Sequence, residues 1–133
     1  MIYVDAEKLR VVMTEVLSGL KVNGDSIRHL TDSVLEASLK GIDTHGLALF
    51  PHYVEGFSKG RLKRNPQFRI LKNNAAAKVV DADGAVGHHA GIFAMDFALT
   101  WPQNTVRVLL PSKILRILEL QIFSPSMLPA TIC

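Results

Sequence analysis

The sequence predicts an α/β (α+β) fragment in which a helical amino-terminal segment is followed by two short strands and a further helix. Three observations lead to this fold class. Apolar residues recur at helical spacing three times before residue 60, short extended runs follow between residues 68 and 80, and an alanine-rich helical pattern comes next. The 133 residues are 48% apolar, which is enough for one hydrophobic core and excludes a disordered chain.

The first helix is predicted to begin after Asp5 and to end at Gly24. Asp5 suits the N-cap position because its carboxylate can accept the free amide hydrogens of the first turn. The apolar residues that follow have the spacing of a single helix face, which we expect to lie in the core: Leu9, Val12, Met13, Val16, Leu17 and Leu20.

Two more helices are predicted before residue 60. One begins at Asp25 or Ser26 and ends at Gly41, whose missing side chain permits a left-handed helix end. The other ends at Gly60. The first two helices should pack as an antiparallel pair. The predicted core positions of the second helix are Ile27, Leu30, Val34 and Ala37. Those of the third helix are Leu47, Phe50, Val54 and Phe57.

The pattern changes after the basic segment 59–64. Residues 68–71 and 77–80 are short runs of extended type, separated by Asn73-Asn74, which favours a turn, and residues 81–84 make a tight exit. A fourth helix is predicted from Gly87, with small residues at Ala90, Ala94 and Ala98 that allow a close neighbour.

Composition limits the function classes. The net charge is only +3 and the basic residues are scattered, so no nucleic-acid partner is expected, and segment 59–64 is interpreted as a solvated loop in preference to a phosphate site. Charged residues interrupt every apolar run before it could span a membrane. A single cysteine, Cys133, gives neither an internal disulfide nor a metal framework. Without an apolar leader after Met1, we expect a cytoplasmic protein.

The strongest candidate for chemistry is the loop 41–46, Gly-Ile-Asp-Thr-His-Gly. It combines an imidazole that can exchange a proton near neutral pH, at His45, with two glycines that allow a ligand close to the backbone. The alternative is structural: Asp43 or Thr44 caps a helix that starts near Gly46, and His45 is a plain surface residue.

The second candidate is the segment 87–91 at the start of the fourth helix, where exposed amides and His88 or His89 could hold an anion. Its glycine spacing does not give G-x-G-x-x-G, so a Rossmann site is not supported. Adjacent histidines on a helix point in different directions, so no metal site is expected there. His29 and His52 are interpreted as ordinary surface or packing residues.

Several of these motifs together resemble the amino-terminal part of one enzyme family. The motifs are the stretch 37–46 (ASLKGIDTHG), then Phe50-Pro51-His52-Tyr53 and Gly60, and then 80–84 (VDADG), 87–91 (GHHAG) and Ala94-Met95. Over residues 5–100 they are similar to the malate/L-lactate dehydrogenase family, which is unrelated to the Rossmann-type lactate and malate dehydrogenases. Residues 1–100 are therefore expected to be the family-like domain.

The resemblance implies a cytoplasmic, homodimeric oxidoreductase that transfers a hydride between NAD or NADP and a 2-keto acid, imino acid or 2-hydroxy acid. By position in the motif, His45 would protonate or orient the substrate carbonyl oxygen, and Thr44 could hydrogen-bond the substrate. Many relatives carry an arginine four residues after the histidine, where this chain has Leu49. The resemblance assigns no cofactor-binding residue and no metal.

Residues 101–133 depart from the family pattern, and we expect an irregular, aggregation-prone tail there. Permitted codons for 102–133, read one frame over, encode a glycine-containing string with a histidine that is similar to the family's next segment. We therefore expect a truncation by a frameshift near residue 101 and negligible turnover. The alternative is a non-catalytic helical fragment that pairs with a related subunit through the first two helices and the alanine row of the fourth.

Overall fold

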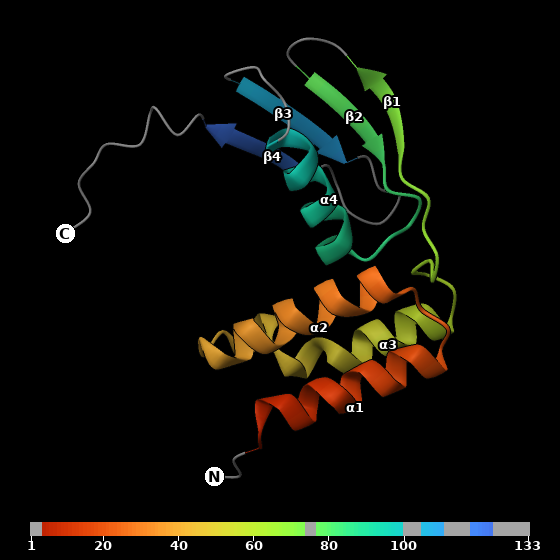
Figure 1. Cartoon of the computed structure of the whole chain (residues 1–133), viewed down its shortest axis with the longest axis vertical. Helices are drawn as coiled ribbons and strands as arrows, with labels where there is room; N and C mark the ends of the chain where they lie inside the picture. The colour runs from red at the N-terminus through yellow and green to blue at the C-terminus, as the bar shows by residue number, and fades with distance from the viewer. Residues whose placement is uncertain (1–3, 74–76, 100–104, 111–117, 124–133) are drawn as a thin grey trace, which may run out of the picture. The chain divides into compact units, whose positions relative to one another are not determined.

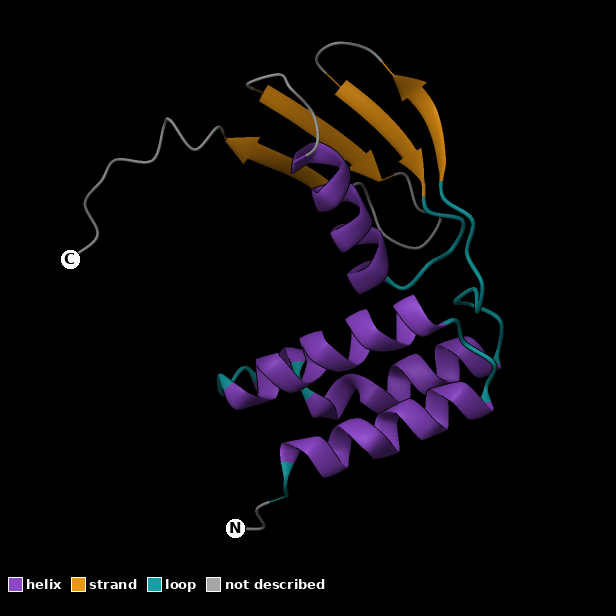
Figure 2. Cartoon of the chain, viewed as in Figure 1, coloured by secondary structure: helices purple, strands orange, loops and turns teal. Residues whose placement is uncertain are grey.

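The computed structural model describes residues 4–73, 77–99, 105–110 and 118–123. The chain forms two compact units (Figures 1 and 2). The helical unit comprises Met1–Pro66 and Gly84–Ile92, and the sheet unit comprises Gln67–Asp83 and Phe93–Cys133. No described helix is both long and apolar enough to cross a membrane.

The helical unit consists of α1 (Ala6–Gly19), α2 (Gly24–Leu39), α3 (Phe50–Ser58) and the first turns of α4 (Gly87–Leu99). Two short 3-10 turns, Asp43–His45 and Leu47–Leu49, connect α2 to α3. Figure 1 shows α1, α2 and α3 side by side, and they share one core. The largest of its fully buried side chains are Phe57, Met13, Leu17, Leu30 and Val34.

The start of α1 is as predicted, but its end is not. The Asp5 carboxylate accepts the amide hydrogens of Glu7 at 2.9 Å and Lys8 at 3.0 Å, which confirms the N-cap. The helix ends at Gly19 instead of Gly24, because Lys21 takes the left-handed conformation (φ 60°) that closes the helix. Gly24 instead begins α2, behind the N-cap Asn23.

The predicted core face of α1 was partly wrong. Met13 and Leu17 are buried, but Val12 is 53% exposed and Val16 39% exposed. The reason is geometric: consecutive helix residues are about 100° apart, so the six predicted positions cover a wider stripe than the neighbouring helices bury. The i, i+4 row through Leu9, Met13 and Leu17 faces the core.

The sheet unit has four strands in the order β1-β2-β3-β4: β1 (Arg69–Asn73), β2 (Ala77–Asp81), β3 (Thr105–Leu110) and β4 (Leu118–Phe123). The β1–β2 and β3–β4 pairs are antiparallel, whereas β2 and β3 are parallel and are connected through α4. This strand–helix–strand connection between parallel neighbours is the α/β element of the fold. The predicted turn at Asn73-Asn74 extends outside the described residues.

The expectation of an irregular tail after residue 101 was wrong for two segments, since 105–110 and 118–123 are strands. Missing glycines and a missing family pattern do not prevent strand formation. Segments rich in valine, leucine, isoleucine and threonine are prone to extend, and β2 offers a free edge on which β3 pairs.

The predicted tight turn after β2 is confirmed, and so is the predicted close packing along the small residues of α4. Asp83 and Gly84 have positive φ angles, and the Asp83 amide donates to the Asp81 carboxylate at 2.9 Å. In the sheet unit, the Phe68 and Phe93 rings stack at 4.3 Å. The alanine row of α4 is buried, which removes it as a free pairing surface: Ala90, Ala94 and Ala98 are 5%, 0% and 7% exposed.

Candidate functional site

The first candidate loop begins at a helix end that only glycine accommodates well. Gly41 has a φ of +72°, and two hydrogen bonds close α2 around it. The Gly41 amide donates to the Ser38 carbonyl at 3.0 Å, and the Ile42 amide donates to the Ala37 carbonyl at 2.8 Å. This pair of bonds is the Schellman motif, and it turns the chain sharply back along α2.

The second glycine of the loop is required by close packing. A Cβ atom on Gly46 would lie 2.3 Å from the Ser38 hydroxyl oxygen and 3.2 Å from the Ser38 backbone. The same hydroxyl accepts the Leu47 amide hydrogen at 2.8 Å. The loop is therefore held against the last turn of α2 on the carboxyl side of His45.

His45 and Thr44 both lie exposed on the 3-10 turn Asp43–His45. The Thr44 hydroxyl oxygen is 3.0 Å from His45 Nδ1, so the hydroxyl engages this ring nitrogen and Nε2 is left for another partner. Neither Asp43 nor Thr44 caps a helix: the N-cap positions of the two turns and of α3 are Ile42, Gly46 and Leu49, and α3 begins only at Phe50. The structural alternative for these two residues is therefore wrong.

His88, from the second candidate segment, lies near this loop. Its ring makes an edge contact with Tyr53 of α3, with ring centres 5.4 Å apart. Burial lowers the pKa of His88, and the positive charge that His45 can carry lowers it further. Burial also raises the pKa of Tyr53. We call Thr44, His45, Tyr53 and His88 the histidine site.

One atom of this site has an unusual environment. Among the residues that the structure describes, His88 Nδ1 is buried and has no hydrogen-bond partner. A buried polar atom without a partner costs roughly 1–3 kcal/mol. Such atoms are few in native proteins, which makes His88 a candidate for a functional role.

His89 points away from the histidine site, as predicted for adjacent residues of a helix. Its Nδ1 lies 2.8 Å from the buried Ser26 hydroxyl of α2, and its ring centre is 5.3 Å from that of His29. Burial lowers the pKa of His89, and the charge of nearby His29 lowers it further. His88 and His89 therefore take part in two separate histidine pairs.

His52 is exposed, and its Nε2 lies 2.9 Å from an Arg61 guanidinium nitrogen. Its ring centre is 6.2 Å from that of Tyr53, so His52 lies beside the histidine site. The rest of the basic segment 59–64 is engaged locally, for example by the 2.5 Å pair between Lys59 and Glu55.

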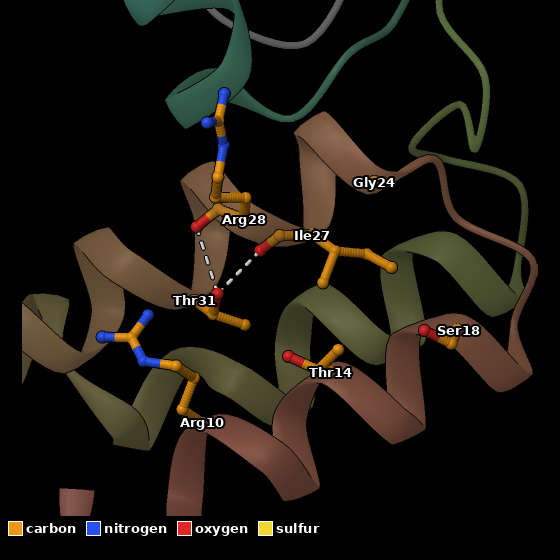
Figure 3. Close-up of a pocket in the computed structure, with 7 residues that line it drawn as sticks. All are labelled: Arg10, Thr14, Ser18, Gly24, Ile27, Arg28 and Thr31. Carbon is orange, nitrogen blue, oxygen red and sulfur yellow. Dashed lines mark hydrogen bonds between the residues drawn. The ribbon is translucent and has the colours of Figure 1, made fainter. Parts of the chain in front are cut away.

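A hollow of about 300 Å³ lies between α1 and α2 (Figure 3). Its two arginines are already paired, Arg10 with Asp32 and Glu7, and Arg28 with Asp25 at 3.6 Å. Its lining residues are Arg10, Thr14, Ser18, Gly24, Ile27, Arg28 and Thr31.

Within the described ranges, no three His, Cys, Asp or Glu side chains are grouped to hold a metal ion. At the start of α4, the sequence-predicted anion site, the Ala90 amide donates to the Val86 carbonyl, and His89 Nδ1 lies 2.8 Å from the Ser26 hydroxyl. The Ala90 amide and His89 Nδ1 are therefore engaged within the chain.

Comparison with known proteins identifies the family. Residues 4–105 match the sequence profile of the malate/L-lactate dehydrogenases. The chain belongs to this family. Both histidine-containing motifs, 41–46 and 87–91, fall inside the matched segment. The resemblance noted from the motifs is thereby confirmed.

Individual relatives agree with this assignment. The chain is 29% identical over 98 residues to L-sulfolactate dehydrogenase of Methanocaldococcus jannaschii, covering 74% of this chain and 28% of that protein. It is 32% identical over 91 residues to hydroxycarboxylate dehydrogenase B of Escherichia coli O157:H7, covering 68% and 25%. The chain thus spans about a quarter of the length of these two relatives. Their names place the family among the hydroxy acid dehydrogenases.

The fold is shared with solved members. The structure of malate dehydrogenase from Pyrococcus horikoshii OT3 matches with a TM-score of 0.77 and 23% identity, over 82% of this chain and 32% of that one. The α/β fragment is thus the family's fold. From the sequence, the motifs 41–46 and 87–91 were two separate candidates, and Tyr53 had no predicted role. The spacing of residues along the chain does not show whether segments 43 residues apart lie close together in the fold. Their occurrence in one family pattern was the only available signal.

Proposed function

We propose that this chain carries the proton-transfer side of a 2-hydroxy acid dehydrogenase. In such a reaction NAD or NADP supplies or accepts the hydride, and the protein gives a proton to the oxygen of a 2-keto acid or takes it from a 2-hydroxy acid. The observation that supports this proposal is an exposed imidazole, His45, whose Nδ1 is engaged by the Thr44 hydroxyl on a loop inside the segment that matches this family. The family membership supplies the reaction class, and the histidine site supplies the acid.

The geometry suggests how each residue of the loop would act. With Nδ1 of His45 engaged by Thr44, the Nε2–H of the protonated ring is the group that can donate to a substrate oxygen. If the Thr44 hydroxyl accepts from Nδ1–H, its own hydrogen remains for a second substrate oxygen. Thr44 would thus orient the His45 ring and contact the substrate.

A binding measurement tests this proposal without the cofactor. We expect pyruvate to bind the purified chain in isothermal titration calorimetry, and His45→Gln to weaken binding about tenfold or more, because a charge-assisted hydrogen bond contributes roughly 1.5–3 kcal/mol. His29→Gln is the matched control, since it removes a histidine that lies against His89 and outside the site. Equal affinity for the wild type and His45→Gln would contradict the proposal.

We propose negligible turnover for this chain alone, because the family resemblance assigns none of its residues to the cofactor. Incubation with NADH or NADPH and a panel of 2-keto acids, followed by nicotinamide absorbance, tests this; rapid oxidation of the cofactor would contradict it.

We further propose a cytoplasmic homodimer for the intact enzyme and an out-of-frame segment after residue 101. An uninterrupted frame at that codon in the gene would contradict the latter.

One observation favours pairing with a related subunit as a second candidate function. α1 exposes a group of valines that its own unit does not bury: Val11 and Val12 are 54% and 53% exposed, and Val16 is 39% exposed. Such exposed apolar groups are typical of interaction surfaces. Co-purification with an intact relative, lost in Val12→Ser, would support this function, and unchanged recovery of the variant would contradict it.

A further inference from the structure

The Ser38 hydroxyl, in the last turn of α2, contacts two successive residues just after His45. It accepts the Leu47 amide hydrogen at 2.8 Å. It also faces the Gly46 backbone so closely that a Cβ atom on Gly46 would lie 2.3 Å from the hydroxyl oxygen. This side chain therefore closes the carboxyl end of the loop 41–46 on α2.

The amino end of the same loop is closed by the main chain. The amides of Gly41 and Ile42 donate to carbonyls in the last turn of α2, at 3.0 and 2.8 Å. Within the loop, the His45 amide donates to the Ile42 carbonyl at 3.0 Å. Since main-chain bonds do not depend on side-chain identity, Ser38 is the residue whose replacement would open the loop at one end and leave the other end closed.

Leu47 extends this connection from α2 into the core. Its half-buried side chain packs against the core of the helical unit. Its amide is the first of the 3-10 turn Leu47–Leu49, so it has no acceptor within that turn, and Ser38 supplies one. The exposed His45 ring contacts its neighbour Thr44, so its position relative to α2 is set by the backbone on either side of it.

We propose that Ser38 is a positioning residue for His45: its hydroxyl holds the carboxyl end of the loop on α2 and thereby fixes where the imidazole meets a substrate oxygen. This inference rests on the proposed function of His45 as the acid. A proton donor has to lie about 2.6–3.2 Å from the reacting oxygen, and a displacement of about 1 Å can cost on the order of a hundredfold in rate. Ser38 acts through the backbone and does not touch the substrate.

Backbone nitrogen relaxation, measured by NMR on the full chain, tests whether Ser38 holds the loop. In Ser38→Ala we expect the order parameters of residues 44–47 to fall from about 0.85, typical of rigid backbone, toward about 0.6. Thr31→Ala is the matched control. It removes a hydroxyl that donates to the Ile27 carbonyl at 2.9 Å, about two turns before Ser38 in the same helix (Figure 3). Unchanged order parameters of residues 44–47 in Ser38→Ala, or an equal fall in Thr31→Ala, would overturn the inference.

Pyruvate affinity, measured by isothermal titration calorimetry, tests whether this rigidity serves His45. Ser38→Ala should bind pyruvate about threefold to tenfold more weakly, which corresponds to the loss of one hydrogen bond. Thr31→Ala should bind pyruvate as the wild type does. Unchanged affinity in Ser38→Ala, or equal weakening in both variants, would overturn the positioning role. If the wild type does not bind pyruvate, the proposed function fails, and the relaxation data still decide whether Ser38 holds the loop.

Discussion

Replacing Gly46 by alanine should disrupt the loop that carries His45. The new Cβ would lie 2.3 Å from the Ser38 hydroxyl oxygen, which must then move and release the Leu47 amide that it accepts at 2.8 Å. The Ser38 backbone, at 3.2 Å, cannot rotate away as a side chain can. The hydroxyl bond contributes about 1 kcal/mol, and overpacking adds roughly 1–3 kcal/mol.

The free energy of unfolding of Gly46→Ala should therefore fall by about 2–4 kcal/mol, measured by urea denaturation with circular dichroism. Gly19→Ala is the matched control. A Cβ there meets no atom within 4 Å, so this helical position should become slightly more stable, by about 0.5–1 kcal/mol.

A double-mutant cycle identifies the cause of the loss. Ser38→Ala alone should cost about 1 kcal/mol, because the Leu47 amide loses its acceptor. In the Gly46→Ala background it should cost less, since the clashing oxygen is then absent. A Gly46→Ala variant as stable as the wild type, or strictly additive effects, would refute the reasoning.

Three further predictions concern the helical unit. Lys21→Gly should raise the free energy of unfolding by about 1 kcal/mol in urea, because Lys21 holds a φ of 60° that glycine adopts freely; a loss would contradict this. His88→Phe should leave the free energy of unfolding unchanged or raise it, because among the described residues His88 Nδ1 has no hydrogen-bond partner to lose. His89→Phe should lower it by about 1–3 kcal/mol, because the Ser26 hydroxyl loses its partner. Equal losses in the two variants would contradict this. The pKa values of His88 and His89 are both lowered from 6.5 in the folded chain, so the unfolded chain binds protons more readily. Urea midpoints should therefore fall as the pH drops below 6.5. A constant midpoint between pH 7.5 and 5 would contradict this.

Local signals in the sequence were sufficient for most of the helical unit. Asp5 as an N-cap and Gly41 as a left-handed helix end are decided by a few neighbouring residues, and both were predicted correctly. Lys21 was missed because it takes a conformation that its residue type disfavours, and packing of the following segment enforces it. The exposure of Val12 depends on how wide a face the neighbouring helices cover, which periodicity does not report.

The strands after residue 101 and the histidine site depend on contacts that are distant in sequence. β3 forms on the edge of β2 across the whole of α4, so its partner is not visible in its own residues. Likewise, His88 meets the Tyr53 ring only because the first turns of α4 belong to the helical unit. The sequence could suggest His88 as a candidate but not its contact with Tyr53.

The proposed function requires His45 to be the group that meets the oxygen of a 2-keto acid. The most direct measurement is an NMR titration of the full chain with pyruvate, observing the ring signals of all five histidines. We expect a saturable shift that is largest at His45, smaller at His88 and absent at His89. Saturable binding that leaves the His45 signals in place, or no binding at all, would contradict it.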